Sequence, residues 1–396
     1  MKRSFSLAHL ISAVFFSVVA TVIITVTVVK EFNLFMPSGN YTYENKVSEI
    51  LSLVEQFYVG DVDQKVLADN IVAGCIYGIG DKYSGYYTAE SANERFDSLN
   101  GHFTGMGVQY TVHPNNKTMY IYKVHNGSPA DLAGIIEGDE ILKVDEIDIV
   151  KDGHAKALEY IKSKEIGTSI NVIVLRNGTT VPLTVTLNQF DSQSVFPEMI
   201  GNKGYIYISE FNNNTTDQFV SAVKDLEAKG AAGLIIDLRG NGGGTLTSVT
   251  AMLDFLLPKG LIIETRYKDS RYNESSMSDS SEVSLPMTVL TDGGTASASE
   301  LFAQSLKDYG KAVTIGCKTY GKGVVQRTFT LSDGSLVVFT VAKYYTKSGY
   351  CPDGQGVSAD IETSWSDEEL NQRIINGIKM DKDFLAAVDY LDGQLS

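Results

Sequence analysis

Histidine is scarce in this chain of 396 residues, and its distribution excludes the usual serine active site from most of the sequence. The five histidines are His9, His102, His113, His125 and His154, so none lies after residue 154. A serine hydroxyl becomes a strong nucleophile only when a base takes its proton, and that base is usually histidine. A nucleophilic serine after residue 154 therefore needs a different base.

Cysteine is also scarce, and the 33 lysines and arginines are fewer than the 48 acidic residues. Cys75, Cys317 and Cys351 are widely spaced and show no CxxC or Cys/His spacing typical of zinc, so they predict no metal site. The function expected below also needs no metal and no cofactor. At least one thiol must be free, and the sequence leaves open whether Cys317 and Cys351 pair. The net charge of −15 argues against nucleic acid as a partner.

One long uncharged run stands near the amino terminus, from Ile11 to Val29. As a helix it spans about 28 Å, close to the thickness of a bilayer's hydrocarbon core. Lys2 and Arg3 precede it, so residues 1–30 predict a cytoplasmic stub with a transmembrane helix. The expected localisation is the cell membrane, single-pass, with the following chain extracytoplasmic. The alternative is a cleaved signal peptide, but the run is long for one and lacks an Ala-x-Ala site.

The remaining chain changes pattern several times, which predicts several domains. Residues 42–98 show helical periodicity, residues 99–190 show short β runs with glycine turns, and residues 191–365 alternate strands with helices. Such alternation is typical of an α/β layer fold. Residues 366–396 form an amphipathic tail that packs on residues 42–98 or makes a homodimer contact, and the sequence does not choose between these.

A serine and a lysine in the alternating region are candidates for catalysis. An apolar β run at 287–290 ends in a Gly293-Gly294 turn, and a helical pattern follows, which places Ser297 near a helix start. The free amides of a helix start stabilise an oxyanion. Lys322, between two glycines, is the remaining base. Its pKa must fall by roughly 3 units from about 10.4 to serve near neutrality.

Residues 294–300 (Gly-Thr-Ala-Ser-Ala-Ser-Glu) and 319–326 (Thr-Tyr-Gly-Lys-Gly-Val-Val-Gln) together resemble the carboxyl-terminal processing, or tail-specific, proteases. These are serine peptidases with a Ser/Lys dyad and an internal PDZ domain. The resemblance implies that Ser297 is the nucleophile, Lys322 the general base and Gln326 the residue that orients the lysine amine. It gives Asp308 a structural role.

The same resemblance assigns the oxyanion hole. The glycine-rich residues 239–245 lack the Lys-Ser/Thr of a phosphate loop and do not fit GxGxxG, so they do not predict nucleotide binding. They match instead a family loop that supplies one oxyanion amide. The resemblance assigns that amide to Gly243 and the second amide to Ala298.

Residues 127–145 carry a specific PDZ signature. In such a domain a loop of backbone amides holds the free carboxyl terminus of a peptide, which adds a strand to the sheet edge. The resemblance places this loop at Gly105, Met106, Gly107 and Val108.

The expected fold is α/β multidomain, with an N-terminal transmembrane helix, a helical segment, a β-rich PDZ domain and an α/β crotonase-like (ClpP/crotonase) serine protease core. The expected function is that of a membrane-anchored extracytoplasmic serine endopeptidase that cleaves proteins selected by their carboxyl-terminal tails. Two alternatives stay open: a catalytically silent PDZ scaffold that binds tails, and a crotonase-type enzyme acting on acyl thioesters.

Overall fold

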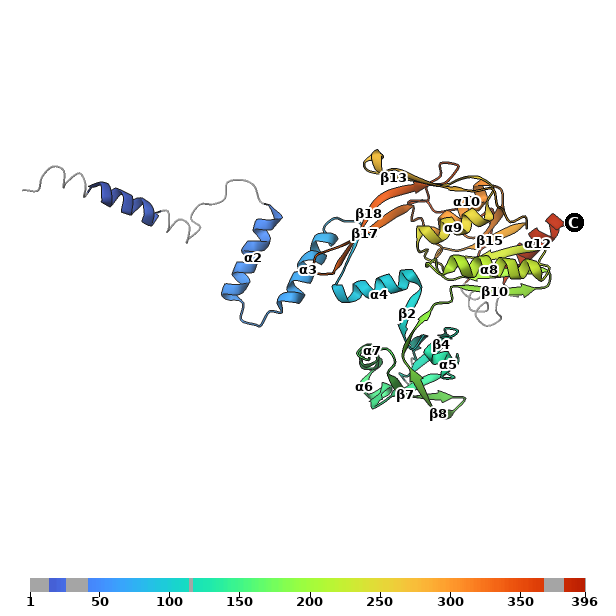
Figure 1. Cartoon of the computed structure of the whole chain (residues 1–396), viewed down its shortest axis with the longest axis horizontal. Coiled ribbons are helices and arrows are strands. Elements are labelled where there is room, and N and C mark those ends of the chain that lie inside the picture. Colours follow the sequence, from blue (N-terminus) through green and yellow to red (C-terminus); the bar gives the residue numbers. More distant parts are fainter. Residues whose placement is uncertain (1–13, 26–41, 114–116, 367–380, 396) are drawn as a thin grey trace, which may run out of the picture. The chain divides into compact units, whose positions relative to one another are not determined.

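The computed structural model describes residues 14–25, 42–113, 117–366 and 381–395 (Figure 1). The chain divides into two compact units, residues 1–68 and residues 69–396. The first unit contains a helix over residues 14–25 and helix α2, Tyr43–Phe57. Helix α3, Gln64–Tyr77, begins in the first unit and ends in the second.

The expected transmembrane anchor is not supported by the structure. No helix among the described residues is both long enough and apolar enough to cross a bilayer. The described helix over residues 14–25 covers only part of the run from Ile11 to Val29, and the rest of that run lies outside the described residues. The prediction of a membrane-spanning helix, and the single-pass localisation that rests on it, are therefore contradicted.

The predicted PDZ region folds as a β structure with short helices. Its sheet has the order β3-β4-β5-β7-β8, with β6 beside β5, and β3 at the edge. The strands are β3 Val108–Val112, β4 Met119–Val124, β5 Glu140–Val144, β6 Ile147–Asp148, β7 Ser169–Arg176 and β8 Thr179–Thr186. The helices are α5 Pro129–Leu132, α6 Ile149–Asp152 and α7 His154–Lys162. A separate pair, β2 His102–Gly105 and β9 Asn188–Asp191, stands where the chain enters and leaves this region.

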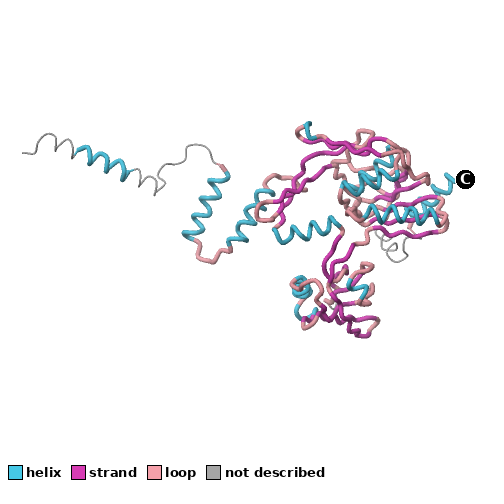
Figure 2. Tube along the Cα trace, in the orientation of Figure 1, coloured by secondary structure: helices cyan, strands magenta, loops and turns pink. Residues whose placement is uncertain are grey.

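A six-stranded sheet forms the centre of the region from residue 195 onward (Figure 2, magenta). Its order is β10-β11-β12-β15-β16-β19, and every pair except β10 with β11 is parallel. The strands are β10 Val195–Ile200, β11 Lys203–Ile208, β12 Gly233–Asp237, β15 Met287–Thr291, β16 Ala312–Gly316 and β19 Ile361–Glu362.

Helices cover both faces of this sheet because its strands are apolar on both sides. Ile236 and Val289 pack with helices α8 Thr215–Ala228, α9 Leu246–Leu256 and α10 Ala298–Asp308. Their neighbours Ile235 and Leu290 point to the opposite face, where helix α12, Lys382–Leu395, packs. The strand and helix alternation expected from the sequence is thus present.

A second sheet has the order β1-β18-β13-β14, with β17 also paired to β18. Its strands are β1 Gly85–Tyr87, β13 Gly260–Tyr267, β14 Glu274–Ser278, β17 Val324–Thr330 and β18 Leu336–Tyr345, and a 3-10 turn η1, Ser270–Tyr272, joins β13 to β14. The sequence predicted helices throughout residues 42–98. Residues Gly85–Tyr87 are instead strand β1, which pairs with β18, more than 200 residues later in the chain. Helix α4, Ala89–Asn100, follows β1.

The carboxyl-terminal helix packs on its own core, and neither packing expected from the sequence is supported. Phe384, Ala387 and Leu391 of α12 are buried in the apolar cluster on the second face of the parallel sheet. Because these side chains are covered within the chain, they are not available for the expected homodimer contact; Ile374, Ile375 and Ile378 of the predicted stripe lie outside the described residues.

A buried ion cluster fixes the start of α12 to the end of β12. The guanidinium of Arg239 donates to Asp237 at 2.5 Å, to Asp381 at 2.7 Å and to Asp383 at 2.8 Å. All four side chains are at most 2% exposed. Arg239 opens the glycine-rich loop, so the cluster also anchors that loop.

We predict that Arg239→Met lowers the free energy of unfolding by about 3–5 kcal/mol, because three buried carboxylates lose their cation. Urea denaturation at neutral pH measures this change. Lys229→Met is the control, since Lys229 pairs with Asp225 at the exposed end of α8, and the stability of this variant should change little. An Arg239→Met protein as stable as the wild type would contradict the structural role of the cluster.

Candidate active site

Three neighbouring parallel strands bring the predicted catalytic residues to one edge of the sheet. β12, β15 and β16 pair in that order and run in the same direction. Their carboxyl ends therefore meet at one edge, where open α/β sheets place ligands. The loops that follow these strands carry Gly243, Ser297 and Lys322, respectively.

Ser297 stands in a strained backbone conformation directly before helix α10. Its φ is 58° and its ψ is −116°, a region that non-glycine residues rarely occupy. The glycine-rich loop packs against it. A Cβ placed on Gly243 would lie 2.8 Å from the Cβ of Ser297 and 2.9 Å from the amide nitrogen of Ala298. Only glycine permits this approach, and the φ of 104° at Gly243 also favours glycine.

Glu300, in the first turn of α10, joins the serine loop to the lysine loop. Its carboxylate is fully buried, and one oxygen, Oε2, accepts hydrogen bonds from the amides of Ser297 and Lys322, both at 2.8 Å. The other oxygen accepts from the hydroxyl of Thr319 at 2.5 Å and the amide of Gly321 at 2.8 Å. Four donors and the amino-terminal end of the helix dipole stabilise the buried charge.

Tyr344 joins the same two residues through their carbonyl groups, as a hydrogen-bond donor. Its hydroxyl lies 2.8 Å from the carbonyl oxygen of Ser297 and 3.3 Å from that of Lys322, so one proton is shared between the two carbonyls. Burial raises the pKa of Tyr344 well above its usual range, which keeps this proton in place. The backbones of Ser297 and Lys322 are therefore held against one carboxylate oxygen and one hydroxyl.

The amine of Lys322 is held by a relay of two hydrogen bonds. Its Nζ donates to Oε1 of Gln326 at 2.9 Å, and Nε2 of Gln326 donates to the backbone carbonyl of Tyr83. The ring of Tyr83 lies 5.0 Å from the same amine. The expected contact between Gln326 and Lys322 is thus present in the structure.

The surroundings of the amine favour its neutral form. Burial lowers the pKa of Lys322, and the positive charge of Arg95 lowers it further. Tyr320, Asp81 and Glu300 act in the opposite direction with smaller effects. The net shift is downward, the direction that a base near neutrality requires.

The two predicted oxyanion amides differ in availability. The amide of Gly243 donates to Oδ1 of Asn241 at 2.8 Å, and Nδ2 of Asn241 donates to the carbonyl of Ile208, which fixes this side chain. Among the described residues no acceptor bonds the amide of Ala298. Ala298 therefore presents an open donor beside Ser297, while the donor of Gly243 is already engaged.

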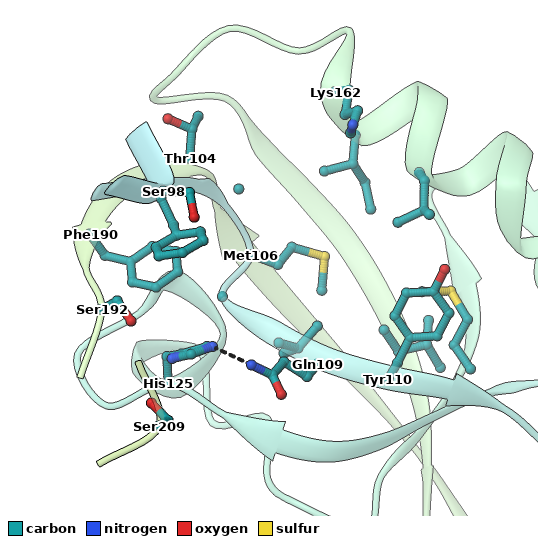
Figure 3. A pocket seen from close by; sticks show the side chains of 18 of the residues that line it. Ser98, Thr104, Met106, Gln109, Tyr110, His125, Lys162, Phe190, Ser192 and Ser209 are labelled. Carbon is teal, nitrogen blue, oxygen red and sulfur yellow. Dashed lines mark hydrogen bonds between the residues drawn. The ribbon is translucent and has the colours of Figure 1, made fainter. Parts of the chain in front are cut away.

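The second candidate site is a groove in the PDZ region (Figure 3). Its cavity, of about 540 Å³, lies between the edge strand β3 and helix α7, which contributes Leu158 and Ile161. Met106, Gln109 and Tyr110 lie around it in Figure 3. The mostly apolar lining next to an unpaired strand edge fits an added peptide strand.

The predicted carboxylate loop lies at one end of this groove. Gly105, Met106, Gly107 and Val108 all line the cavity. Gly107 has a φ of 80°, and a Cβ there would lie 2.2 Å from the Cβ of Ser128, so the loop depends on glycine at this position. No described residue accepts a hydrogen bond from the amides of Met106 or Gly107.

Comparisons with known proteins identify the family of the chain and its two main domains. A model of peptidase family S41 matches residues 202–363, and a model of the PDZ domain matches residues 104–187. The carboxy-terminal processing protease CtpA of Bacillus subtilis is 30% identical over 360 residues, which cover 87% of this chain and 77% of that relative. The chain belongs to the carboxy-terminal processing proteases of family S41. It is a serine-type protease of this family with a PDZ domain.

Two further comparisons extend this assignment. A protein named as a CtpA-like serine protease of Staphylococcus aureus is 29% identical over 357 residues, which cover 89% of this chain and 71% of that relative. A solved structure assigned to the S41 proteases of Bacteroides fragilis aligns with a TM-score of 0.59 at 19% identity, covering 91% of this chain and 99% of that chain. The latter shows a shared fold.

In this S41 protease several residues near the site were absent from the sequence predictions. Glu300 carries a local signal, since Ser-x-x-Glu before an apolar run is a helix-start pattern. Tyr344 and Tyr83 carry none, because they reach the site from distant strands and loops. Asp308 bonds Thr346 and Ser348, and the structural role expected for it agrees with these contacts.

The cysteines of this protease are free, so Cys317 and Cys351 do not pair. Burial raises the pKa of both thiols, which favours the neutral, unreactive form. Cys351 contacts the carbonyl of Gly323 at 3.7 Å, next to the lysine loop.

We predict that Gly243→Ala lowers proteolytic activity at least about 100-fold, since its methyl group would displace Ser297 or the amide of Ala298. Cleavage of an unstructured protein measures the effect. Gly240→Ala is a matched control, because Gly240 lies in the same loop with a φ of 73° and a Cβ there meets nothing within 4 Å. Equal losses of activity in both variants would show that strain from the positive φ, and not contact of the new methyl group with Ser297, causes the loss.

Proposed function

We propose that this S41 protease cleaves proteins selected by their carboxyl-terminal tails, and that Ser297 and Lys322 form its catalytic dyad. The observation that carries the proposal is the shared anchoring of the two residues. Oε2 of Glu300 bonds both amides, and the hydroxyl of Tyr344 bonds both carbonyls. Two loops held this way have little freedom to separate.

In the proposed reaction the neutral amine of Lys322 accepts the hydroxyl proton of Ser297. The serine oxygen bonds to the carbonyl carbon of the scissile peptide, the C–N bond then breaks, and the ammonium of Lys322 returns the proton to the leaving amine. Water next attacks the acyl ester and gives its proton to Lys322. The bond between the acyl carbon and the serine oxygen then breaks, the ammonium of Lys322 returns the proton to that oxygen, and the carboxylic acid product leaves. Gln326 positions the amine throughout, because it accepts one N–H and leaves the lone pair free.

The amide of Ala298 stabilises the oxyanion that forms in each step. Gly243 serves as the second donor by sharing its N–H between Oδ1 of Asn241 and the oxyanion, as a three-centre hydrogen bond. The close approach of Gly243 to Ser297 supports this assignment.

The groove of the PDZ domain selects the substrate. A tail adds to the edge of β3, and its free carboxylate binds the open amides of Met106 and Gly107, with Gly105 and Val108 shaping the loop. The cavity beside these amides is lined mostly by apolar side chains, so it accepts an apolar last residue.

We predict that the full-length wild-type chain cleaves an unstructured protein such as casein, and that Ser297→Ala and Lys322→Ala each lose about 10³-fold or more of that activity. Because the base must be neutral, kcat/KM should rise as the pH rises through the lowered pKa of Lys322 and then level off. Product formation at several pH values measures both effects. If either variant still cleaves the substrate at the wild-type rate, the assignment of Ser297 and Lys322 as the catalytic dyad is wrong.

We also predict that Lys322→Met is inactive yet more stable than the wild type at pH 7. Folding lowers the pKa of Lys322. Between this lowered pKa and the unfolded value of about 10.4, the folded protein binds fewer protons than the unfolded chain. The free energy of unfolding of the wild type therefore rises with pH across this window. Urea denaturation from pH 7 to pH 10 should show that the difference in unfolding free energy between Lys322→Met and the wild type becomes smaller as the pH rises.

Lys343→Met is the matched control for this prediction. Lys343 pairs with Asp353 at 2.8 Å, and that hydrogen bond raises the pKa of Lys343, so its removal should not stabilise the protein. A Lys322→Met protein that is less stable than the wild type at pH 7 would contradict the prediction, because it would show that burial of the amine does not destabilise the folded state.

A further inference from the structure

The turn before strand β1, residues 81–84, reaches the proposed dyad, although it lies upstream of the residues matched by either family model. The backbone carbonyl of Tyr83 accepts a hydrogen bond from Nε2 of Gln326. The centroid of the Tyr83 ring lies 5.0 Å from Nζ of Lys322. One residue of this turn therefore bonds the side chain that holds the amine and also lies against the amine itself.

Hydrogen bonds within the turn fix the position of Tyr83. Oδ1 of Asp81 accepts from the amide of Tyr83 at 3.1 Å, and Oδ2 accepts from the hydroxyl of Ser84 at 2.6 Å. The amide of Ser84 donates to the backbone carbonyl of Asp81 at 3.2 Å. The chain then continues into β1, which pairs with β18. The carbonyl of Tyr83 is consequently presented from a well-anchored turn.

Strand β18 holds this turn and Gln326 close to each other. The amide of Thr340 in β18 donates to Oγ of Ser84 at 3.4 Å. Thr340 is also the residue that stands opposite Gln326 in the pairing of β17 with β18. The same strand residue thus bonds the turn and neighbours Gln326, which keeps the carbonyl of Tyr83 within reach of the Gln326 amide.

The carbonyl of Tyr83 decides which end of the Gln326 amide faces the lysine. A carbonyl oxygen only accepts hydrogen bonds, so it must face the NH2 group of Gln326. Oε1 is then directed to Nζ of Lys322, which donates to it at 2.9 Å. In the opposite orientation the NH2 group would donate to the lone pair of the neutral amine. Because that lone pair has to take the proton of Ser297, the opposite orientation would block the base.

The ring of Tyr83 shields the same amine from water. Burial is the largest cause that lowers the pKa of Lys322, and this ring forms one wall beside Nζ. The face of the ring also attracts an ammonium, but water would solvate the ammonium more strongly than the ring does. Loss of the ring would therefore favour the charged lysine.

We propose that Tyr83 is a positioning residue of the reaction, whose carbonyl orients the amide of Gln326 and whose ring covers the amine of Lys322. Together they leave the lone pair of the amine free for the proton of Ser297. The inference rests on the proposed dyad and adds to it a residue from outside the matched protease domain. Tyr83 acts through Gln326 and Lys322.

The charged and titratable groups around the amine stay in place when Tyr83 is replaced. Arg95 lowers the pKa of Lys322, whereas the groups that raise it are Tyr320, Asp81 and Glu300. The amine of Lys82, an exposed residue, lies 4.7 Å from the Tyr83 ring and donates to the hydroxyl of Tyr320 at 3.3 Å. A change at Asp81 would alter both the turn and a nearby charge, so the test varies Tyr83 instead.

The first test is the pH dependence of kcat/KM for the full-length chain, with a fluorogenic unstructured peptide that ends in a free apolar residue. Tyr83→Ala should move the rising limb up by about half to one pH unit, so kcat/KM falls about 3- to 10-fold on that limb and recovers at higher pH. Tyr83→Phe keeps the ring and the carbonyl and should restore the wild-type limb. Tyr272→Ala removes an exposed ring from η1 and should not move the limb.

The second test weakens the carbonyl of Tyr83. Replacing Ser84 by its α-hydroxy acid turns this carbonyl into that of an ester, a poorer acceptor, and should lower kcat about 5-fold with KM unchanged, even where the amine is neutral. The replacement also deletes the amide of Ser84, which donates to Asp81. The matched control replaces Tyr83 by its α-hydroxy acid. It deletes the other amide that donates to Asp81 but keeps the Tyr83 carbonyl as an amide, so it should lose less activity.

Three results would each overturn the proposal: an unshifted limb in Tyr83→Ala, a loss in that variant that is uniform at all pH values, or equal losses in the two ester variants. Melting temperatures accompany each profile, and Tyr83→Val replaces Tyr83→Ala if the latter unfolds. Ser297→Ala and Lys322→Ala are measured alongside. If both are inactive and Tyr83→Ala is unshifted, the dyad stands and only the role of Tyr83 fails.

Discussion

The carboxylate of Glu300 is the interaction on which the site depends. The serine and the lysine follow two different strands, and nothing in either strand fixes the distance between the loops. Oε2 of Glu300 bonds the amide of each, at 2.8 Å in both cases. Because Glu300 belongs to the first turn of α10, the helix start that would stabilise an oxyanion also fixes the backbone of Lys322, the proposed base.

The same carboxylate creates an electrostatic conflict that other residues must offset. A negative charge near Lys322 favours the protonated amine, which cannot act as a base. The charge of Glu300 is directed to three backbone amides and one hydroxyl, and no hydrogen bond joins it to the amine. Burial of Nζ is the larger effect and lowers the pKa of Lys322, and the positive charge of Arg95 acts in the same direction.

Much of the core could be predicted from the sequence because its signals are local. The apolar run before Ser297 and the helical pattern after it correspond to β15 and α10. The sequence did not predict β1, the contacts of Tyr344 or the packing of α12, since each depends on segments far apart in the chain. The uncharged run near the amino terminus predicted a membrane helix, and the described helices do not support it. The dyad itself stays a prediction.

The strained backbone of Ser297 explains why so many contacts converge on one residue. A φ of 58° at a non-glycine residue costs of order 1–3 kcal/mol and persists only when its surroundings hold it in place. Glu300 holds its amide, Tyr344 holds its carbonyl, and Gly243 leaves space beside its Cβ. Loosening any of these contacts would let the serine relax toward ordinary helical geometry, away from the open amide of Ala298. The position of Ser297 therefore depends on this network of contacts, and so does its proposed role as the nucleophile.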